Sequence, residues 1–398
     1  MEKADLKRAG FMNAVKNGGD IWFCNVYNST LVRFNVETGE IHIETFLPAR
    51  SLTGKIQYGA IAVYKNLLVI APRNAESIQV YDINLKELKE ISLSISADGE
   101  RINNLFVSVQ ICNGVAYFFP GKYPGIVTLD LNSFEVKCYS DWIDTVYNLM
   151  PDQKSVICNE VPVLIDDTYF IPLYRADGIL KFNIDVGVTE LCMMSVDKTM
   201  ISGFKFDGKY FWISYADTNN LARWDYKNNQ TDIFNLDLDG YKATQGFAML
   251  FCYNDLVILV PKTGNMLVAF DKKEERFRRF TTQEFCCESP KLELVLDKRA
   301  FLGTYMIEDK LILYSSFEGK IYYIDCESED VFAYDAYFSR DEDVFKIKKI
   351  YISRNEILME KHDVSLEDFI DFVEKKECEQ LDSVVYTIGE KIWKDING

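Results

Sequence analysis

The stretch from Tyr58 to Leu93 has the sequence YGAIAVYKNLLVIAPRNAESIQVYDINLKELKEISL. It contains four short segments rich in Ile, Val and Tyr, and their partial alternation of apolar and polar residues is typical of half-buried β-strands. Lys65-Asn66 and Asn84-Leu85-Lys86 suit tight hairpin turns, whereas the join around Arg73–Glu76 is looser. The stretch therefore predicts a four-stranded antiparallel unit.

The same unit recurs seven times between Gly10 and about Phe338. Its second strands align on Trp22, Leu68, Tyr117, Phe170, Trp212, Val257 and Ile312. Its third strands are LVRFNV, IQVYDI, IVTLDL, ILKFNI, LARWDY, LVAFDK and IYYIDC. Each third strand ends at an Asn or Asp that begins a turn, and we expect longer turns at Asn35, Asn183 and Asp225.

A single four-stranded unit cannot bury both of its faces, so neighbouring units must stack, and radial stacking gives a β-propeller. A glycine begins the first strand of five units, as expected for inner strands that crowd an axis: Gly10, Gly59, Gly203, Gly246 and Gly303. We predict an all-β, seven-bladed β-propeller of four-stranded antiparallel blades over residues 1–360. Six or eight blades are alternatives, because Phe345–Glu360 could form a further hairpin or a closing strand.

Residues 361–398 are predicted to form a C-terminal helical extension that packs on the propeller. Ser365 and Asp368 resemble a capping box, and apolar residues follow at helical spacing.

Composition limits the classes of function. The formal net charge is -17, from 44 Lys+Arg and 61 Asp+Glu, which disfavours binding to nucleic acid. The first 20 residues lack the apolar core of a signal peptide, and no apolar run is long enough to span a bilayer. We therefore expect a cytoplasmic protein with no membrane partner and with its ten cysteines reduced.

The residues that mark common active sites are scarce. The chain has two histidines, His42 and His362, which lie far apart in sequence and offer neither a metal cage nor the base of a catalytic triad. No glycine-rich phosphate loop occurs. We expect no metal and no cofactor.

The unit DIWFCNVYNSTLVRFNVETGEI, Asp20–Ile41, resembles the blades of streptogramin-lyase-like and NHL-like propellers. The whole chain, including the SLEDFIDF and GEKIWKDI segments, is similar to uncharacterised bacterial β-propeller proteins. The resemblance implies the fold. The catalytic histidines of the lyases have no counterpart in these blades.

The joins between second and third strands should lie on the same face as the long segments between units, because the strands run up and down. They supply a set of cations and tyrosines that we predict to converge on one axial pocket: Tyr27, Arg73, Lys122, Tyr174, Arg175, Tyr215 and Lys262. Such a ring suits an anionic group or a sugar. The alternative is that these residues are ordinary polar loop tips.

The predicted function is a non-catalytic binding or scaffolding module that recognises a small polar or anionic ligand, a glycan or a protein partner on this elaborated loop face. The alternative is a histidine-independent lyase or hydrolase at the axial funnel, using Tyr, Arg and carboxylates. A purely structural role would instead require a broad apolar patch.

Overall fold

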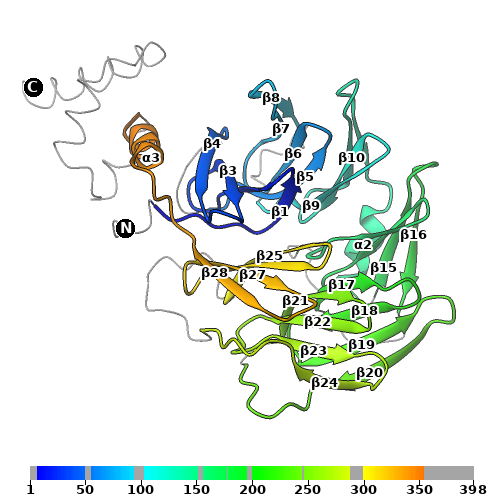
Figure 1. Cartoon of the computed structure of the whole chain (residues 1–398). Coiled ribbons are helices and arrows are strands. Elements are labelled where there is room, and N and C mark those ends of the chain that lie inside the picture. The colour runs from blue at the N-terminus through cyan, green and yellow to red at the C-terminus, as the bar shows by residue number, and fades with distance from the viewer. Residues whose placement is uncertain are drawn as a thin grey trace, which may run out of the picture.

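The structure is a computed structural model that describes residues 7–49, 55–93, 103–150, 156–176, 178–194, 200–243, 246–286 and 299–353. These residues form seven four-stranded sheets around one axis, and the predicted seven-bladed β-propeller is confirmed (Figure 1). The predicted helix after Ser365, and all of residues 361–398, lie outside the described residues.

Each blade is one contiguous segment of chain. Blades 1 to 3 comprise β1 (Ala14–Asn17), β2 (Asp20–Cys24), β3 (Thr30–Asn35) and β4 (Ile41–Phe46); β5 (Tyr58–Tyr64), β6 (Leu67–Pro72), β7 (Ser77–Asp82) and β8 (Glu87–Ser92); and β9 (Phe106–Cys112), β10 (Val115–Pro120), β11 (Ile126–Asp130) and β12 (Val136–Tyr139). Blades 4 and 5 comprise β13 (Val163–Ile165), β14 (Thr168–Pro172), β15 (Gly178–Asn183) and β16 (Thr189–Met193); and β17 (Ile201–Phe206), β18 (Phe211–Tyr215), β19 (Asn220–Asp225) and β20 (Gln230–Asn235). Blades 6 and 7 comprise β21 (Phe247–Tyr253), β22 (Leu256–Pro261), β23 (Val268–Asp271) and β24 (Arg276–Arg279); and β25 (Phe301–Ile307), β26 (Lys310–Ser315), β27 (Lys320–Asp325) and β28 (Val331–Asp335).

The first strand of each blade lies innermost, and first strands of neighbouring blades contact one another, as β1 does with β5 and β25. Gly303 shows how closely they approach, because a Cβ atom there would overlap the carbonyl oxygen of Phe11. The register corrects two positions of the sequence alignment. Val69 and Ile258, rather than Leu68 and Val257, stand where Trp22 stands in blade 1, two residues into the second strand.

The turn between third and fourth strands is the same in all seven blades. The side-chain oxygen of the Asn or Asp that ends each third strand accepts hydrogen bonds from the backbone N–H groups two and three residues later. The residues are Asn35, Asp82, Asp130, Asn183, Asp225, Asp271 and Asp325. The longer turns expected at Asn35, Asn183 and Asp225 are therefore wrong, since one Asx turn serves every blade.

The hydrophobic core lies in the seams between blades rather than at a single centre. Between blades 4 and 5, for example, Phe170 packs against Phe211, and Phe211 packs against Phe204 and Trp224. Because both faces of each sheet are buried in this way, successive residues of the second strands, such as Leu68 and Val69, are both fully buried.

The two ends of the described chain close the ring. Ala9 donates its backbone N–H to Ala336, Phe338 donates to Lys7, and Arg8 pairs with Tyr337. The closure thus joins a short segment before blade 1 to a short segment after blade 7, and none of the seven sheets formed by the described residues mixes strands from the two ends.

Helix α3 (Asp341–Ser353) replaces the hairpin or closing strand expected at Phe345–Glu360, as far as that range is described. Three acidic residues, Asp341, Glu342 and Asp343, occupy its first turn, where they favour a helix. Val344 and Ile347 lie on one helical face and are buried in the seam between blades 7 and 1. The helix therefore covers the closure, beside β4 (Figure 1).

Helix α2 (Ile143–Leu149) lies in the long segment between blades 3 and 4, which the sequence left irregular. Among the described residues, no helix has the length and apolar character to cross a membrane.

Candidate functional site

Backbone hydrogen bonds link successive loops on the face that carries the long loops. Gly121, just after β10, donates its N–H to Leu105, which leads into blade 3, and Ile157, which leads into blade 4, donates to Gly121. Tyr174 then donates to Ile157. The same alternation links Lys262 and Ala300 on the other side of the ring. The joins after the second strands and the segments leading into the blades therefore lie on one face, as expected.

Two of the predicted site residues make contacts at the inner edge of this face. The Arg73 side chain lies over Gly59 of β5, and its Nη1 lies 3.4 Å from Sδ of Met12. The Tyr27 hydroxyl is 2.7 Å from that of Tyr314, and the Arg8 guanidinium lies 5.3 Å from the Tyr27 ring centroid. Tyr27 thus belongs to the seam between blades 7 and 1.

Three other predicted residues differ in exposure. Tyr215 is 0% exposed and packs in the core between blades 4 and 5, so its side chain is not on the surface of the face. Lys122 and Lys262 are half-buried at equivalent joins of blades 3 and 6. The structure therefore arranges these joins around one rim but does not bring all seven predicted side chains into one pocket.

Tyr174 and Arg175 form the part of the predicted set that meets other charged groups. The Arg175 guanidinium lies 6.0 Å from the Tyr174 ring centroid, and Arg175 makes no ion pair within the described part of the chain. Burial raises the pKa of Tyr174, while the positive charges of Arg175 and Arg299 oppose that rise.

Glu160, Lys205 and Arg299 add a charged cluster that comes from three blades. Glu160 precedes β13 of blade 4, Lys205 lies in β17 of blade 5, and Arg299 precedes β25 of blade 7. The charges of Lys205 and Arg299 both act on Glu160, and that of Glu160 also acts on Tyr174. Blades 4 and 7 are not neighbours, so groups from both can interact only where the blades converge. The cluster therefore lies at the axis.

The carboxyl group of Glu160 is the most strongly perturbed acid of this cluster. The residue is 5% exposed, and burial raises the pKa of its carboxyl well above the usual range. Burial likewise lowers the pKa of the Lys205 ammonium, which Glu160 partly restores. Lys205 also lies 5.7 Å from the Phe251 ring of blade 6. Glu160 is therefore a buried acid whose charge partner, Lys205, is half-buried.

Sequence reasoning missed Glu160, Lys205 and Arg299. One signal was available for Lys205, because it is the one lysine or arginine among the described first strands of blades 2 to 7. Glu160 and Arg299 end the two longest segments between units, where acids and bases are common and nothing local distinguishes them.

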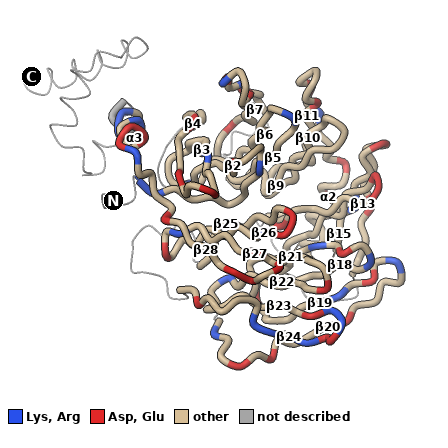
Figure 2. Tube along the Cα trace, viewed as in Figure 1, with Lys and Arg blue, Asp and Glu red and all other residues tan. Residues whose placement is uncertain are grey.

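No group of three or more His, Cys, Asp or Glu side chains that could hold a metal ion is found in the described residues. Over the outer strands and hairpins, acidic and basic residues are interspersed rather than segregated (Figure 2). What the axial cluster offers chemically is cationic and phenolic hydrogen-bond donors beside one buried carboxyl group.

Comparisons with known proteins agree with the fold. No protein-family model matches the sequence, and the search of curated proteins gives no match. Virginiamycin B lyase from Staphylococcus aureus is similar in structure, with a TM-score of 0.55 and 10% identity over 79% of this chain and 94% of that chain. The designed Ika8 protein has a TM-score of 0.52 and 11% identity over 84% of this chain and 89% of that chain. The RRP9 WD40 repeats have a TM-score of 0.52 and 9% identity over 77% and 87%. The TM-scores show a shared β-propeller fold, and the low identities show that the similarity is distant.

Proposed function

We propose that this protein is a non-catalytic binding module that takes a small anionic ligand at the axis, on the face that carries the long loops. The observation that carries the proposal is the meeting of charged groups from blades 4, 5 and 7 beside Tyr174 and Arg175. β-Propellers commonly serve as binding scaffolds, and loops on a rigid scaffold are the usual place for a ligand.

The charges of the cluster favour an anion. Glu160 and Lys205 act on each other, so the pair is neutral overall whether the proton lies on the acid or on the base. Arg175 and Arg299 are permanent cations whose charges act on Tyr174, and Asp217, whose charge also acts on Tyr174, is exposed to solvent. Two guanidinium groups and a phenol provide the hydrogen-bond donors that a carboxylate or phosphate requires.

Titration calorimetry with inorganic phosphate and with succinate tests this proposal. Arg175→Ala should weaken binding by about 10- to 150-fold, which corresponds to the roughly 1.5–3 kcal/mol of a hydrogen bond to a charged group. Arg276→Ala, an exposed arginine on the outer strand β24, is the matched control and should leave binding unchanged. Absence of binding by either anion, or equal effects of the two substitutions, would contradict the proposal.

A second candidate function is a histidine-independent lyase or hydrolase at the same place. Glu160 lies close enough to Tyr174 for their charges to interact, and a carboxyl group whose pKa is raised by burial holds its proton more firmly and can serve as a general acid toward a leaving group. Proton release from a panel of small esters and lactones tests it. The enzyme hypothesis requires turnover that Glu160→Gln abolishes while anion binding persists.

A cytoplasmic location remains a prediction, and so does the absence of nucleic-acid and membrane partners. A glycan or a protein partner on the same face remains an alternative to the small anion, and these classes would be separated by glycan-array and pull-down measurements on the Arg175→Ala variant.

A further inference from the structure

Arg8 carries the most deeply buried positive charge among the lysines and arginines that the structure describes. The residue is 7% exposed and lies in the short segment before blade 1, at the closure of the ring. Its Nη2 donates a hydrogen bond to the carbonyl oxygen of Ser316, just after β26 of blade 7. Its guanidinium group also lies 5.3 Å from the ring centroid of Tyr27, in the join between β2 and β3 of blade 1. Arg8 therefore contacts both blades that meet at the closure.

The charge of Arg8 has no acid to balance it. No acid in the part of the chain that the structure describes makes an ion pair with Arg8. The groups near its charge are instead the phenols of Tyr314, Tyr27 and Tyr337. Phenols are neutral at pH 7, and burial raises the pKa of Tyr314 well above its ordinary value. These side chains therefore supply dipoles but no negative charge.

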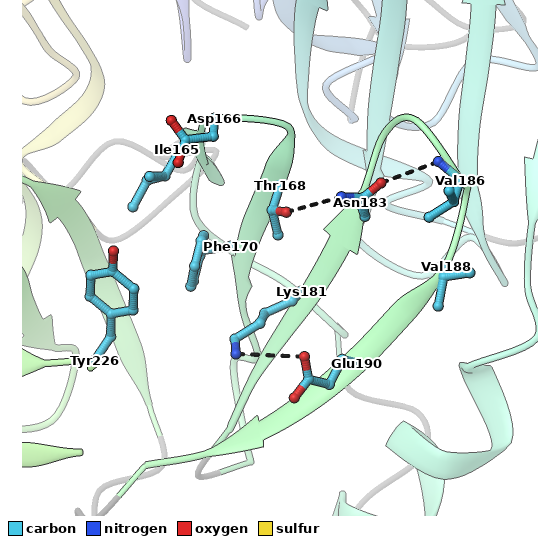
Figure 3. Close-up of a pocket in the computed structure, with 10 residues that line it drawn as sticks. All are labelled: Ile165, Asp166, Thr168, Phe170, Lys181, Asn183, Val186, Val188, Glu190 and Tyr226. Atoms are coloured by element: carbon cyan, nitrogen blue, oxygen red, sulfur yellow. Dashed lines mark hydrogen bonds and ion pairs between the residues drawn. The ribbon is translucent and has the colours of Figure 1, made fainter. Parts of the chain in front are cut away.

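Other partly buried cations of the ring show the usual arrangement. The Lys272 side chain is 18% exposed, and its Nζ lies 3.3 Å from Asp207 Oδ2. Lys181 lies in the lining of a groove of about 470 Å³, where its side chain is 26% exposed and its Nζ is 3.7 Å from Glu190 Oε2 (Figure 3). Both lysines are more exposed than Arg8, and both have an acid. A buried cation without one is thus the exception in this molecule.

Two buried hydrogen-bond donors at the closure also have no acceptor among the described residues, Arg8 Nε and Asn28 Nδ2. Asn28 is 1% exposed, and its Oδ1 accepts hydrogen bonds from Asn25 Nδ2 at 2.8 Å and from Thr30 Oγ1 at 2.7 Å. These two bonds fix the orientation of the Asn28 amide. Because Asn25 Nδ2 also donates to the Arg8 carbonyl oxygen at 3.1 Å, both donors belong to one hydrogen-bonded cluster. Buried donors are rarely left unpaired, so this cluster calls for an acceptor.

The acceptor must also carry negative charge. A water molecule can accept a hydrogen bond from Arg8 Nε, but it leaves the charge of the guanidinium group unbalanced. Burying a cation is costly unless an opposite charge lies beside it. An anion meets both requirements, because it accepts hydrogen bonds and neutralises the cation.

The charge and the space at the closure restrict the anion. One guanidinium group balances one negative charge, so a doubly charged anion would leave an excess of buried charge. The packing is also close, because a Cβ atom on Gly10 would lie 2.5 Å from the ring of Tyr314. We propose that the closure binds a small monovalent anion of the size of chloride, which pairs with Arg8 and accepts a hydrogen bond from its Nε.

This site involves none of the residues of the axial cluster, and its role differs from that of the axial ligand. The anion removes the cost of holding a buried cation against Ser316, and it therefore stabilises the contact between the first described segment and blade 7. Asn28 Nδ2 is the second candidate donor, because it belongs to the same hydrogen-bonded cluster.

Thermal unfolding of the full chain tests the proposal, with potassium chloride exchanged for potassium gluconate at constant ionic strength. Constant ionic strength keeps general screening the same, and gluconate is too large for the site. For a chain of 398 residues, the melting temperature should rise by about 3 °C between no chloride and a hundredfold excess over the dissociation constant. Bromide should act like chloride.

Three variants separate this site from other effects of salt. Arg8→Met keeps a long side chain without the charge and should abolish the response to chloride. Arg276→Met, which changes an exposed arginine of β24, is the matched control and should keep the response. Arg175→Ala should also keep it while losing the binding of phosphate or succinate, so a failure of the closure site and a failure of the axial site are distinguishable.

Crystals grown in bromide provide a second measurement that does not depend on the stability of a variant. The anomalous signal of bromide should give a peak within hydrogen-bonding distance of the Arg8 guanidinium group. The proposal is overturned if the melting temperature of the wild type does not respond to chloride, if Arg8→Met responds as the wild type does, or if no bromide lies beside Arg8.

Discussion

Replacing Asn25 by Ala should loosen the seam that closes the ring. Asn25 is 3% exposed and joins the segment before blade 1 to the loop after β2. Its Oδ1 accepts hydrogen bonds from the N–H groups of Gly10 at 3.1 Å and Tyr27 at 3.3 Å. Its Nδ2 donates to the Arg8 carbonyl at 3.1 Å and to Asn28 Oδ1 at 2.8 Å. One side chain thus satisfies four polar groups at the closure.

The expected loss follows from these four contacts. At about 0.5–1.5 kcal/mol for each hydrogen bond, Asn25→Ala should lower the free energy of unfolding by about 4 kcal/mol. A chain of 398 residues has an unfolding entropy of roughly 0.8 kcal/mol per kelvin, from about 2.1 cal/mol/K per residue. The melting temperature should therefore fall by about 5 °C.

Differential scanning calorimetry measures this shift, and amide hydrogen exchange locates it. Exchange should accelerate first at residues 7–10 and at their partners near Ala336. Asn84→Ala is the control, because Asn84 is exposed and bonds to Asp82 through its backbone N–H rather than its side chain. A melting temperature within about 1 °C of the wild type, or faster exchange that begins in another seam, would refute the assignment of Asn25 as the closing residue.

Three further predictions concern the turns, the axial acid and the thiols. Asn35→Ala removes the acceptor for the N–H groups of Glu37 and Thr38 and the donor to Asp20 Oδ1, and should lower the free energy of unfolding in urea by about 1–2 kcal/mol. Asn35→Asp keeps the acceptor that five other blades use but loses the donor to Asp20, so it should recover only part of this loss. Burial raises the folded-state pKa of Glu160, so its contribution to stability is full below the unfolded pKa of about 4.3 and is lost as the pH rises through the folded pKa. The melting temperature of the wild type should therefore fall relative to that of Glu160→Gln between pH 4 and 9. A constant difference between the two melting temperatures would be evidence against the buried acid. The eight described cysteines are free, and a thiol reagent added after denaturation without reductant should titrate all ten of the chain, so that a smaller number would contradict a reducing location.

The blade architecture was predictable because its signals are local. The Asn or Asp that ends each third strand makes its turn with residues two and three positions away, so motifs such as IQVYDI carry the turn within themselves. The register of the second strands was harder to predict from the sequence. Leu68 and Val69 are both fully buried, one toward each neighbouring blade, so alternation between apolar and polar residues could not tell one face from the other.

Helix α3 was not predicted because the spacing of its apolar residues fits both a β-strand and an α-helix. KIKKIYIS alternates like a strand, yet Ile347 and Ile350 also recur at helical spacing. The seam between blades 7 and 1 decides between them, since it offers Val344 and Ile347 a common apolar site that no strand could fill with both residues. That surface exists only after the ring has closed.

The axial cluster depends on blade order in three dimensions. Glu160 and Arg299 are 139 positions apart by subtraction. The charge of Arg299 nevertheless acts on the Glu160 carboxyl group, because blades 4 and 7 face each other across the axis. Tyr215, in contrast, was predicted to line the axial pocket and is buried in the core. It is the last residue of β18, where Pro72, Pro120, Pro172 and Pro261 end their strands, and it lies one residue too early to reach the open face.

The pairing of Lys7–Ala9 with Ala336–Phe338 also sets a delay during synthesis. The partner of Ala9 is made 327 residues later, by subtraction of 9 from 336. At about 5–20 residues per second, a ribosome needs roughly 16–65 s to produce it. During that interval the first blade is folded against one neighbour, and its other face, with Phe11 and Phe23, has no covering blade. A cell that makes this protein must shield that face for longer than most small domains take to fold.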